Sequence, residues 1–213
     1  MANDLILWGA GTSRTMRAHW MLLELDLDYQ FHPIGSRTGE THTREFLELN
    51  PRRKIPVLQH GSFVLTESAA IIQYLSNTFA SPLIYTADDH QSRAALDEWC
   101  YFIMSELDAG SLYVVRRHDG LKQLYGEAPA AVESAKSYFL HNLRAITRKI
   151  ECHLPYLFGE RLSVADILLM TCLDWAASER ILLPEAAARY HQRVALRPAY
   201  QAALARNFAS YKV

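Results

Sequence analysis

The stretch of residues 50–79 constrains the fold of this chain most strongly, because it joins two short β-type runs directly to a helical pattern. The runs cover residues 55–58 and 63–65, and His60-Gly61-Ser62 between them is typical of a hairpin turn. Apolar residues then recur at helical spacing, at positions 71, 72, 75 and 79. The sequence therefore predicts a strand pair that leads straight into a helix.

Thr66, Glu67 and Ser68 stand at this junction between strand and helix. We expect Thr66 to cap the helix, which leaves backbone N–H groups around Glu67 and Ser68 without intrahelical partners. These groups lie at the positive end of the helix dipole, where a carboxylate or phosphate binds favourably. Pro56 comes where the first strand begins, and from the residues alone a trans peptide bond is the default expectation.

Two signatures occur in this stretch together and in order, NPRRKIPVL at 50–58 and LTESAAI at 65–71. They resemble the glutathione-binding core of the soluble glutathione transferases, which carries N-P-x-x-K-V-P-x-L and T-E-S-x-A-I at this spacing. The resemblance implies that Pro56 follows a cis peptide bond and that the backbone of Ile55 pairs with the cysteinyl part of glutathione like an added strand. It also implies that Glu67 and Ser68 hold the γ-glutamyl end. A hairpin and helix that merely pack are the alternative.

The glycine end of glutathione carries a carboxylate, so a cation is expected near it. The basic run at 52–54 is usual for a solvated surface, but the resemblance points to Lys54, which directly precedes Ile55. Family members also use a His after the second strand. Counted back from Phe46, that position falls on Thr41, and His42 stands one place later. His42 is therefore a candidate contact that departs from the family pattern.

Ser13 lies where the glycine-rich loop of residues 9–13 becomes the helix predicted over 14–27, after a β-type run at 5–8. Its ordinary role would be a helix cap. However, Ser13, Arg17 and the run LELDLDY at 23–29 resemble the serine-type transferases, in which this serine is the catalytic hydroxyl. No His and carboxylate pair is placed to activate Ser13 as a nucleophile. On this resemblance the nucleophile is the glutathione sulfur, and a hydrogen bond from Ser13 favours its thiolate. Thr12 is the nearest alternative donor.

Composition and charge bound the remaining possibilities. The 213 residues are 50% hydrophobic and carry 22 basic and 23 acidic side chains, which argues against a general nucleic-acid binder. No apolar run reaches the roughly 20 residues that span a bilayer, and the start lacks the pattern of a signal peptide. The three cysteines, Cys100, Cys152 and Cys172, are odd in number, so we expect reduced, buried thiols in a cytoplasmic protein. No Cys and His spacing indicates a metal site.

Beyond residue 80 the patterns are helical, over 89–117, 128–153, 163–178, 184–191 and 197–207. Ser163 and Asp166 form a capping box before an apolar run, and we assign this motif to folding. The resemblance implies an α/β thioredoxin-like N-terminal domain over 1–80, a linker over 81–87 and an all-α C-terminal domain over 88–213, which is the glutathione transferase fold.

An acceptor pocket is expected between the two halves, above the sulfur. Candidate lining residues are Tyr101, Phe102, Met104 and Tyr113, although aromatic residues at helical spacing more often belong to a core. Arg117 lies in the polar cluster of residues 116–118, which favours an anionic or carbonyl-bearing acceptor or simply balances the charge at a helix end.

The resemblance covers essentially the whole chain and implies a homodimeric, detoxifying glutathione transferase. Glutathione is the co-substrate, no metal is required, and the second substrate is a small, mostly apolar electrophile. A glutathione-dependent disulfide reductase, dehalogenase or isomerase on the same fold is the alternative enzyme. A non-catalytic glutathione-binding module is the alternative from a different class.

Overall fold

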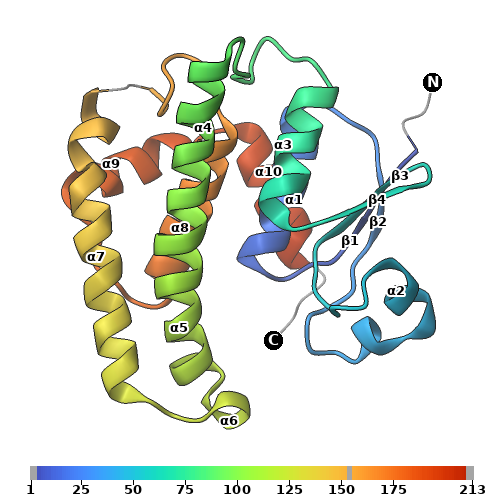
Figure 1. The fold of residues 1–213 in the computed structure, drawn as a ribbon, viewed down its shortest axis with the longest axis horizontal. Coiled ribbons are helices and arrows are strands. Elements are labelled where there is room, and N and C mark those ends of the chain that lie inside the picture. The colour runs from blue at the N-terminus through green and yellow to red at the C-terminus, as the bar shows by residue number, and fades with distance from the viewer. Residues whose placement is uncertain (1–3, 153–154, 210–213) are drawn as a thin grey trace. The chain divides into compact units, whose positions relative to one another are not determined.

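The computed structural model describes residues 4–152 and 155–209. The chain forms two compact units, one built from the residues up to Thr86 together with those from Ala195 onward, and the other from Ala87–Val194 (Figure 1). The grouping differs from the predicted partition, because the last helix packs with the first unit and not with the helical one, and residues 81–86 of the predicted linker also group with the first unit.

The first unit contains a four-stranded sheet in the order β2-β1-β3-β4. Its strands are β1 (Leu5–Trp8), β2 (Gln30–His32), β3 (Val57–His60) and β4 (Phe63–Thr66). Strand β1 runs parallel to β2 and antiparallel to β3, and β3 pairs antiparallel with β4. His60 faces Phe63 across the hairpin, so the predicted turn is the two-residue turn Gly61-Ser62, where Gly61 has a φ of 59°.

In the described part of the first unit, the sheet is accompanied by the α-helices α1 (Ser13–Glu24), α2 (Arg44–Leu49) and α3 (Ser68–Thr78), and α10 (Pro198–Ala209) packs against α1. Side chains alternate between the faces of a strand, and Trp8 of β1 lies in a buried cluster with Phe46 of α2, Ile55 and Val57. Helix α1 packs against both α3 and α10, apart from α2 (Figure 1). The sheet therefore has helices on both faces, and α10 packs against α1 in this unit.

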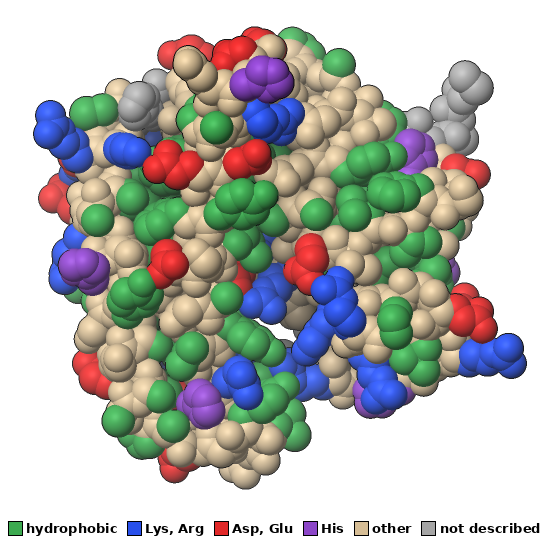
Figure 2. Space-filling model, in the orientation of Figure 1, with side chains coloured by type: hydrophobic (Ala, Val, Ile, Leu, Met, Phe, Trp, Pro, Cys, Tyr) green, Lys and Arg blue, Asp and Glu red, His purple; other side chains and the backbone are tan. Residues whose placement is uncertain are grey.

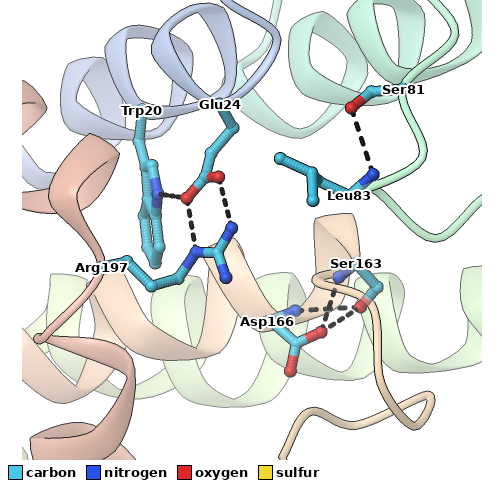
Figure 3. A network of polar contacts seen from close by, with 7 residues as sticks. All are labelled: Trp20, Glu24, Ser81, Leu83, Ser163, Asp166 and Arg197. Atoms are coloured by element: carbon cyan, nitrogen blue, oxygen red, sulfur yellow. Dashed lines mark hydrogen bonds and ion pairs between the residues drawn. The ribbon is translucent and has the colours of Figure 1, made fainter.

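A buried polar network joins α10 to α1 (Figure 3). The carboxylate of Glu24 accepts a hydrogen bond from the indole of Trp20 at 2.7 Å. Arg197, just before α10, donates to the two carboxylate oxygens from Nε at 2.6 Å and from Nη2 at 2.5 Å. This forked ion pair orients the last helix on the first one.

The second unit is helical, and its described residues contain no β-strand. Its helices are α4 (His90–Phe102), α5 (Tyr113–Val115), α6 (Lys122–Tyr125), α7 (Pro129–Cys152), α8 (Val164–Ser178) and α9 (Glu185–Val194). The predicted end of the 128–153 helix at His153 lies outside the described residues.

Between α4 and α5 the chain is π-helical over Ile103–Leu112, and a second π-helical stretch covers Arg116–Gly120. The sequence predicted one uninterrupted helix over 89–117. Gly110 permits the wider turn, because a Cβ atom there would lie 2.8 Å from the carbonyl oxygen of Ser105. The Ser111 hydroxyl donates to the carbonyl of Glu106, five residues earlier, at 2.5 Å.

The capping box predicted at the start of α8 is confirmed (Figure 3). Asp166 is fully buried and accepts hydrogen bonds from the backbone and hydroxyl of Ser163, from the backbone of Leu157 and from the hydroxyl of Tyr190. Burial raises the pKa of the Asp166 carboxyl, and these donors oppose that rise. Burial next to Asp166 also raises the pKa of Tyr190 well above its ordinary value.

Figure 2 shows acidic, basic and hydrophobic side chains interspersed on the face that it draws. Within the described residues, no helix combines the length and the apolar character needed to cross a membrane. The three cysteines are free thiols; Cys100 and Cys172 are buried as expected, whereas Cys152 is exposed, so its predicted burial is wrong.

Candidate functional site

Ser13 is the first residue of α1, and Thr12 is the residue that caps this helix. Thr12 has an extended backbone, and its hydroxyl accepts from the backbone N–H of Thr15 at 3.0 Å. The Thr15 side chain accepts from the backbone N–H of Thr12 at 3.0 Å, which completes a capping box. The interpretation of Ser13 as the cap is therefore wrong. Its half-buried hydroxyl makes no hydrogen bond with another described residue and lies at the positive end of α1.

The loop that leads into Ser13 is held by backbone hydrogen bonds from the sheet side. Gly9 donates to the carbonyl of His32 and Ala10 to that of Ile34, both at 2.9 Å. Gly9 has a φ of 118°, and a Cβ atom there would lie 2.6 Å from Cβ of Ile55. The loop therefore passes directly over Ile55, which brings two parts of the predicted site together.

His19, fully buried in α1, supports the same loop from within the helix. Its Nε2 lies 3.3 Å from the carbonyl oxygen of Gly9, which can only accept, so Nε2 carries the proton. Its Nδ1 then accepts from the hydroxyl of Tyr29 at 2.8 Å. Burial lowers the pKa of His19 to about 4 and raises that of Tyr29 to about 12. The imidazole is consequently neutral, and its two hydrogen bonds link the Gly9 carbonyl to the Tyr29 hydroxyl.

The peptide bond between Ile55 and Pro56 is cis, as the resemblance implied. Both residues are buried just before β3, whose first residue, Val57, pairs with Trp8 of β1.

Glu67 and Ser68 lie at the start of α3, but the helix is capped differently from the prediction. Thr66 is the last residue of β4 and pairs with Val57, so the predicted cap at Thr66 is wrong. Glu67 occupies the cap position with a φ of 69° and no side-chain capping bond. Its exposed carboxylate pairs with Arg52 at 3.0 Å.

Ser68 is buried, and its hydroxyl oxygen accepts a hydrogen bond from Nη1 of Arg17 at 3.1 Å. Arg17 is itself fully buried and lies one helical turn after Ser13. The start of α3 therefore lies against the first turns of α1. Sequence reasoning noted Arg17 in the motif but did not predict this contact.

Lys54 and His42 are exposed, and the contacts within residues 4–152 and 155–209 do not join their side chains to the rest of the candidate site. The backbone carbonyl of Lys54 accepts from the buried Asn50 side chain at 2.8 Å, which fixes the chain just before Ile55. His42 ends the short 3-10 helix Glu40–His42, and Thr41 beside it is buried. Solvent therefore reaches His42 and not its neighbour Thr41.

The candidate pocket residues all belong to the second unit. Tyr101 is 70% exposed, Met104 is half-buried in the first π-helical stretch, and Tyr113 packs edge-on against Trp175 with ring centroids 6.5 Å apart. The guanidinium of Arg117 lies 4.6 Å from the ring centroid of Tyr125. In the part of the chain that the structure describes, no group of His, Cys, Asp or Glu side chains could hold a metal ion.

Comparisons with known proteins agree with this arrangement. The chain matches the family model of the glutathione S-transferase N-terminal domain over residues 3–77 and that of the C-terminal domain over residues 102–198. It is 29% identical over 170 residues to glutathione S-transferase hmp2 of Hypomyces subiculosus, which covers 76% of this chain and 77% of that protein. It is also 29% identical over 147 residues to glutathione S-transferase theta-3 of Mus musculus, covering 68% of this chain but only 61% of the mouse protein.

Among solved structures, the glutathione transferase URE2P6 from Phanerochaete chrysosporium, in complex with oxidized glutathione, aligns over 98% of each chain. The TM-score is 0.84 at 21% sequence identity, which establishes the shared fold. A thioredoxin-like sheet unit combined with a helical unit is the fold class that the sequence predicted, and it is confirmed. This chain belongs to the glutathione S-transferase family.

Proposed function

We propose that this protein binds glutathione, stabilises its thiolate through Ser13 and transfers the sulfur to an electrophilic carbon of a small, mostly apolar compound. The observation that carries the proposal is the division of roles between two neighbouring hydroxyls. Thr12 uses its hydroxyl to cap α1, whereas the Ser13 hydroxyl, which has no hydrogen bond to another described residue, lies at the positive end of the same helix.

The chemical requirement on Ser13 is modest. A thiol with a pKa near 8.5 is only a few per cent thiolate at neutral pH, and the thiolate is the reactive species. Lowering this pKa by two units needs about 2.7 kcal/mol of differential stabilisation. A hydrogen bond to a charged acceptor contributes about 1.5–3 kcal/mol, and a helix N-terminus adds to it. Ser13 and α1 together supply energy of this order.

The rest of the tripeptide fits the polar groups near Ser13 in type. Arg17 donates to the oxygen of Ser68, so the Ser68 O–H and the first N–H groups of α3 can donate to the γ-glutamyl carboxylate. The carboxylate of Glu67 suits the neighbouring ammonium group. The backbone of Ile55 would pair with the cysteinyl part, and Lys54 with His42 would offer positive charge to the glycine carboxylate. The bound oxidized glutathione of the Phanerochaete structure supports this assignment of the ligand.

The electrophile would contact Tyr101, Met104, Tyr113 and Arg117. We further propose that the protein is a cytoplasmic homodimer that detoxifies electrophiles. Light scattering of the purified protein tests the oligomeric state. The free cysteines agree with a reducing compartment.

The decisive experiment compares wild type with Ser13→Ala, with the exposed hairpin variant Ser62→Ala as the matched control. Glutathione affinity is measured by calorimetry, the thiol pKa by thiolate absorbance in the ultraviolet, and turnover with a generic aryl halide. We expect Ser13→Ala to retain binding, to raise the thiol pKa by about 1–2 units and to reduce kcat about 10- to 100-fold. Ser62→Ala should behave as wild type.

Other outcomes point to the alternatives. Binding without turnover in both wild type and Ser13→Ala supports a non-catalytic binding module. Without aryl halide turnover, each of three other activities supports an alternative enzyme. Glutathione-dependent reduction of a mixed disulfide supports a reductase, conversion of an alkyl halide supports a dehalogenase, and conversion of an isomerisable substrate supports an isomerase.

A further inference from the structure

Asn207 in α10 makes three hydrogen bonds with the segment around Ser13, although almost the whole chain separates them in sequence. Its backbone carbonyl accepts from the N–H of Gly11 at 2.9 Å. Its side-chain amide donates to the carbonyl of Thr12 at 3.1 Å, and its side-chain oxygen accepts from the hydroxyl of Thr15 at 2.7 Å. The Asn207 side chain is fully buried, so water does not compete for these contacts.

These three bonds hold the part of the loop that the sheet does not reach. Gly9 and Ala10 are fixed by backbone hydrogen bonds to the carbonyls of His32, the last residue of β2, and of Ile34, two residues beyond it. The next residues before Ser13 are Gly11 and Thr12, and Gly11 has a φ of 75°. Asn207 binds both of them, and through Thr15 it also holds the capping box that starts α1.

The position of the loop before Ser13 matters for the stabilisation of the glutathione thiolate. A hydroxyl stabilises a bound thiolate only when donor and sulfur keep hydrogen-bond distance and direction. Catalytic groups need to be held within about 0.5 Å of the productive geometry, and neighbouring buried hydrogen bonds provide that support. Ser13 directly follows Thr12, so a shift of the Thr12 carbonyl displaces the Ser13 hydroxyl with it.

We propose that Asn207 is a positioning residue for the reaction, which fixes Thr12 and Thr15 so that the Ser13 hydroxyl is aimed at the glutathione sulfur; this rests on the proposed function. Asn207 lies outside both family-model matches, which cover residues 3–77 and 102–198. The glutathione-activating site therefore includes a residue from the last helix.

The test substitutes Asn207 in two ways. Asn207→Ala removes both side-chain bonds but leaves the backbone bond to Gly11. Asn207→Asp keeps an acceptor for Thr15 and loses the donor to Thr12. Gln201→Ala is the matched control, because this amide in the same helix is exposed and donates to the carbonyl of Ala195, away from the loop. Each variant is assayed well below its own melting temperature.

We expect Asn207→Ala to raise the pKa of bound glutathione by about one unit and to lower kcat about tenfold. The KM for glutathione should change little, because Glu67 and Ser68 are untouched. Asn207→Asp should fall between Asn207→Ala and wild type, and Gln201→Ala should match wild type. Thr15→Val removes the bond to Asn207 together with the capping bonds to Thr12. Because one bond is shared, the double variant with Asn207→Ala should lose less than the two single losses combined.

Unchanged thiol pKa and kcat in Asn207→Ala, with wild type showing a lowered thiol pKa, would overturn the positioning role while leaving the proposed function intact. If wild type itself binds glutathione with an ordinary thiol pKa, the proposed function fails and the positioning role fails with it. Should Asn207→Ala not fold, Asn207→Asp decides the matter by the same readouts.

Discussion

The ion pair between Glu24 and Arg197 offers a sharp test of how the last helix is attached to the first unit. We consider Arg197→Met, which keeps a long apolar side chain but removes the guanidinium. Two of the three hydrogen bonds that the Glu24 carboxylate accepts then disappear, and the Trp20 indole remains as donor. The Glu24 side chain is 3% exposed, so water cannot replace the lost donors.

Removing one partner of a buried ion pair costs about 3–5 kcal/mol, because the remaining charge stays buried without compensation. Arg197 is 21% exposed, which places this pair towards the lower value. We therefore expect the free energy of unfolding to fall by about 3 kcal/mol, which for a chain of this size lowers Tm by about 6–12 °C.

The assay is urea and thermal unfolding followed by tryptophan fluorescence and circular dichroism. Arg189→Met is the matched control, because Arg189 pairs with Glu151 at 2.7 Å and with Glu185, but all three side chains are at least half exposed. Exposed pairs contribute about 0–1 kcal/mol, so this variant should lose little. The double variant Glu24→Gln/Arg197→Met should recover much of the loss, since it removes the stranded charge and still accepts from Trp20. Equal losses in Arg197→Met and Arg189→Met would refute the reasoning.

Two further predictions concern buried polar groups. Ser163→Ala should lower the free energy of unfolding by about 2 kcal/mol or more in urea titrations, because it removes the α8 cap and one donor to the buried Asp166. The pKa of His19 is lowered from 6.5 to about 4. The free energy of unfolding of wild type should therefore fall by about 3 kcal/mol between pH 6.5 and pH 4 because His19 takes up a proton on unfolding. His19→Gln should flatten the profile of stability against pH over this range.

The sign for His19 follows from its lowered pKa. The unfolded state binds the proton first as the pH falls, so the contribution is complete above the unfolded pKa and is lost towards the folded one. Parallel pH profiles of wild type and His19→Gln would contradict this assignment. For Ser163, the control is Asp89→Ala at the exposed capping box of α4, where water can satisfy the freed groups. A loss in Asp89→Ala as large as that in Ser163→Ala would contradict the role of burial.

Local sequence signals predicted the elements whose causes are local. The Ser163 to Asp166 capping box and the Gly61 turn depend on residues a few positions apart, and both occur where expected. The choice between Thr12 and Ser13 as the cap of α1 could not be made in this way, because both hydroxyls suit the position. Asn207, from the other end of the chain, holds Thr12 in place.

The remaining differences between the predictions and the structure depend on contacts between residues distant in sequence, or on two conformations that share one sequence pattern. Helical periodicity predicted α10 but carries no information on the unit it packs with. The π-helical stretch around Gly110 has the same apolar pattern as an α-helix, so the sequence predicted a regular one. At the start of α3, the candidate residues Glu67 and Ser68 were foreseen from their motif, whereas the buried guanidinium of Arg17 that binds Ser68 was not.

Because α10 follows the whole helical unit in sequence, a ribosome makes the sheet and α1 long before it makes Asn207, which binds the loop between β1 and α1. At the usual pace of translation, the residues between the two parts of this unit take about 5–20 s to synthesise. During that interval the nascent sheet unit lacks the helix that packs against α1, and the helical unit can become compact first. The sheet unit is therefore completed only after the helical unit has been synthesised, when α10 packs against α1.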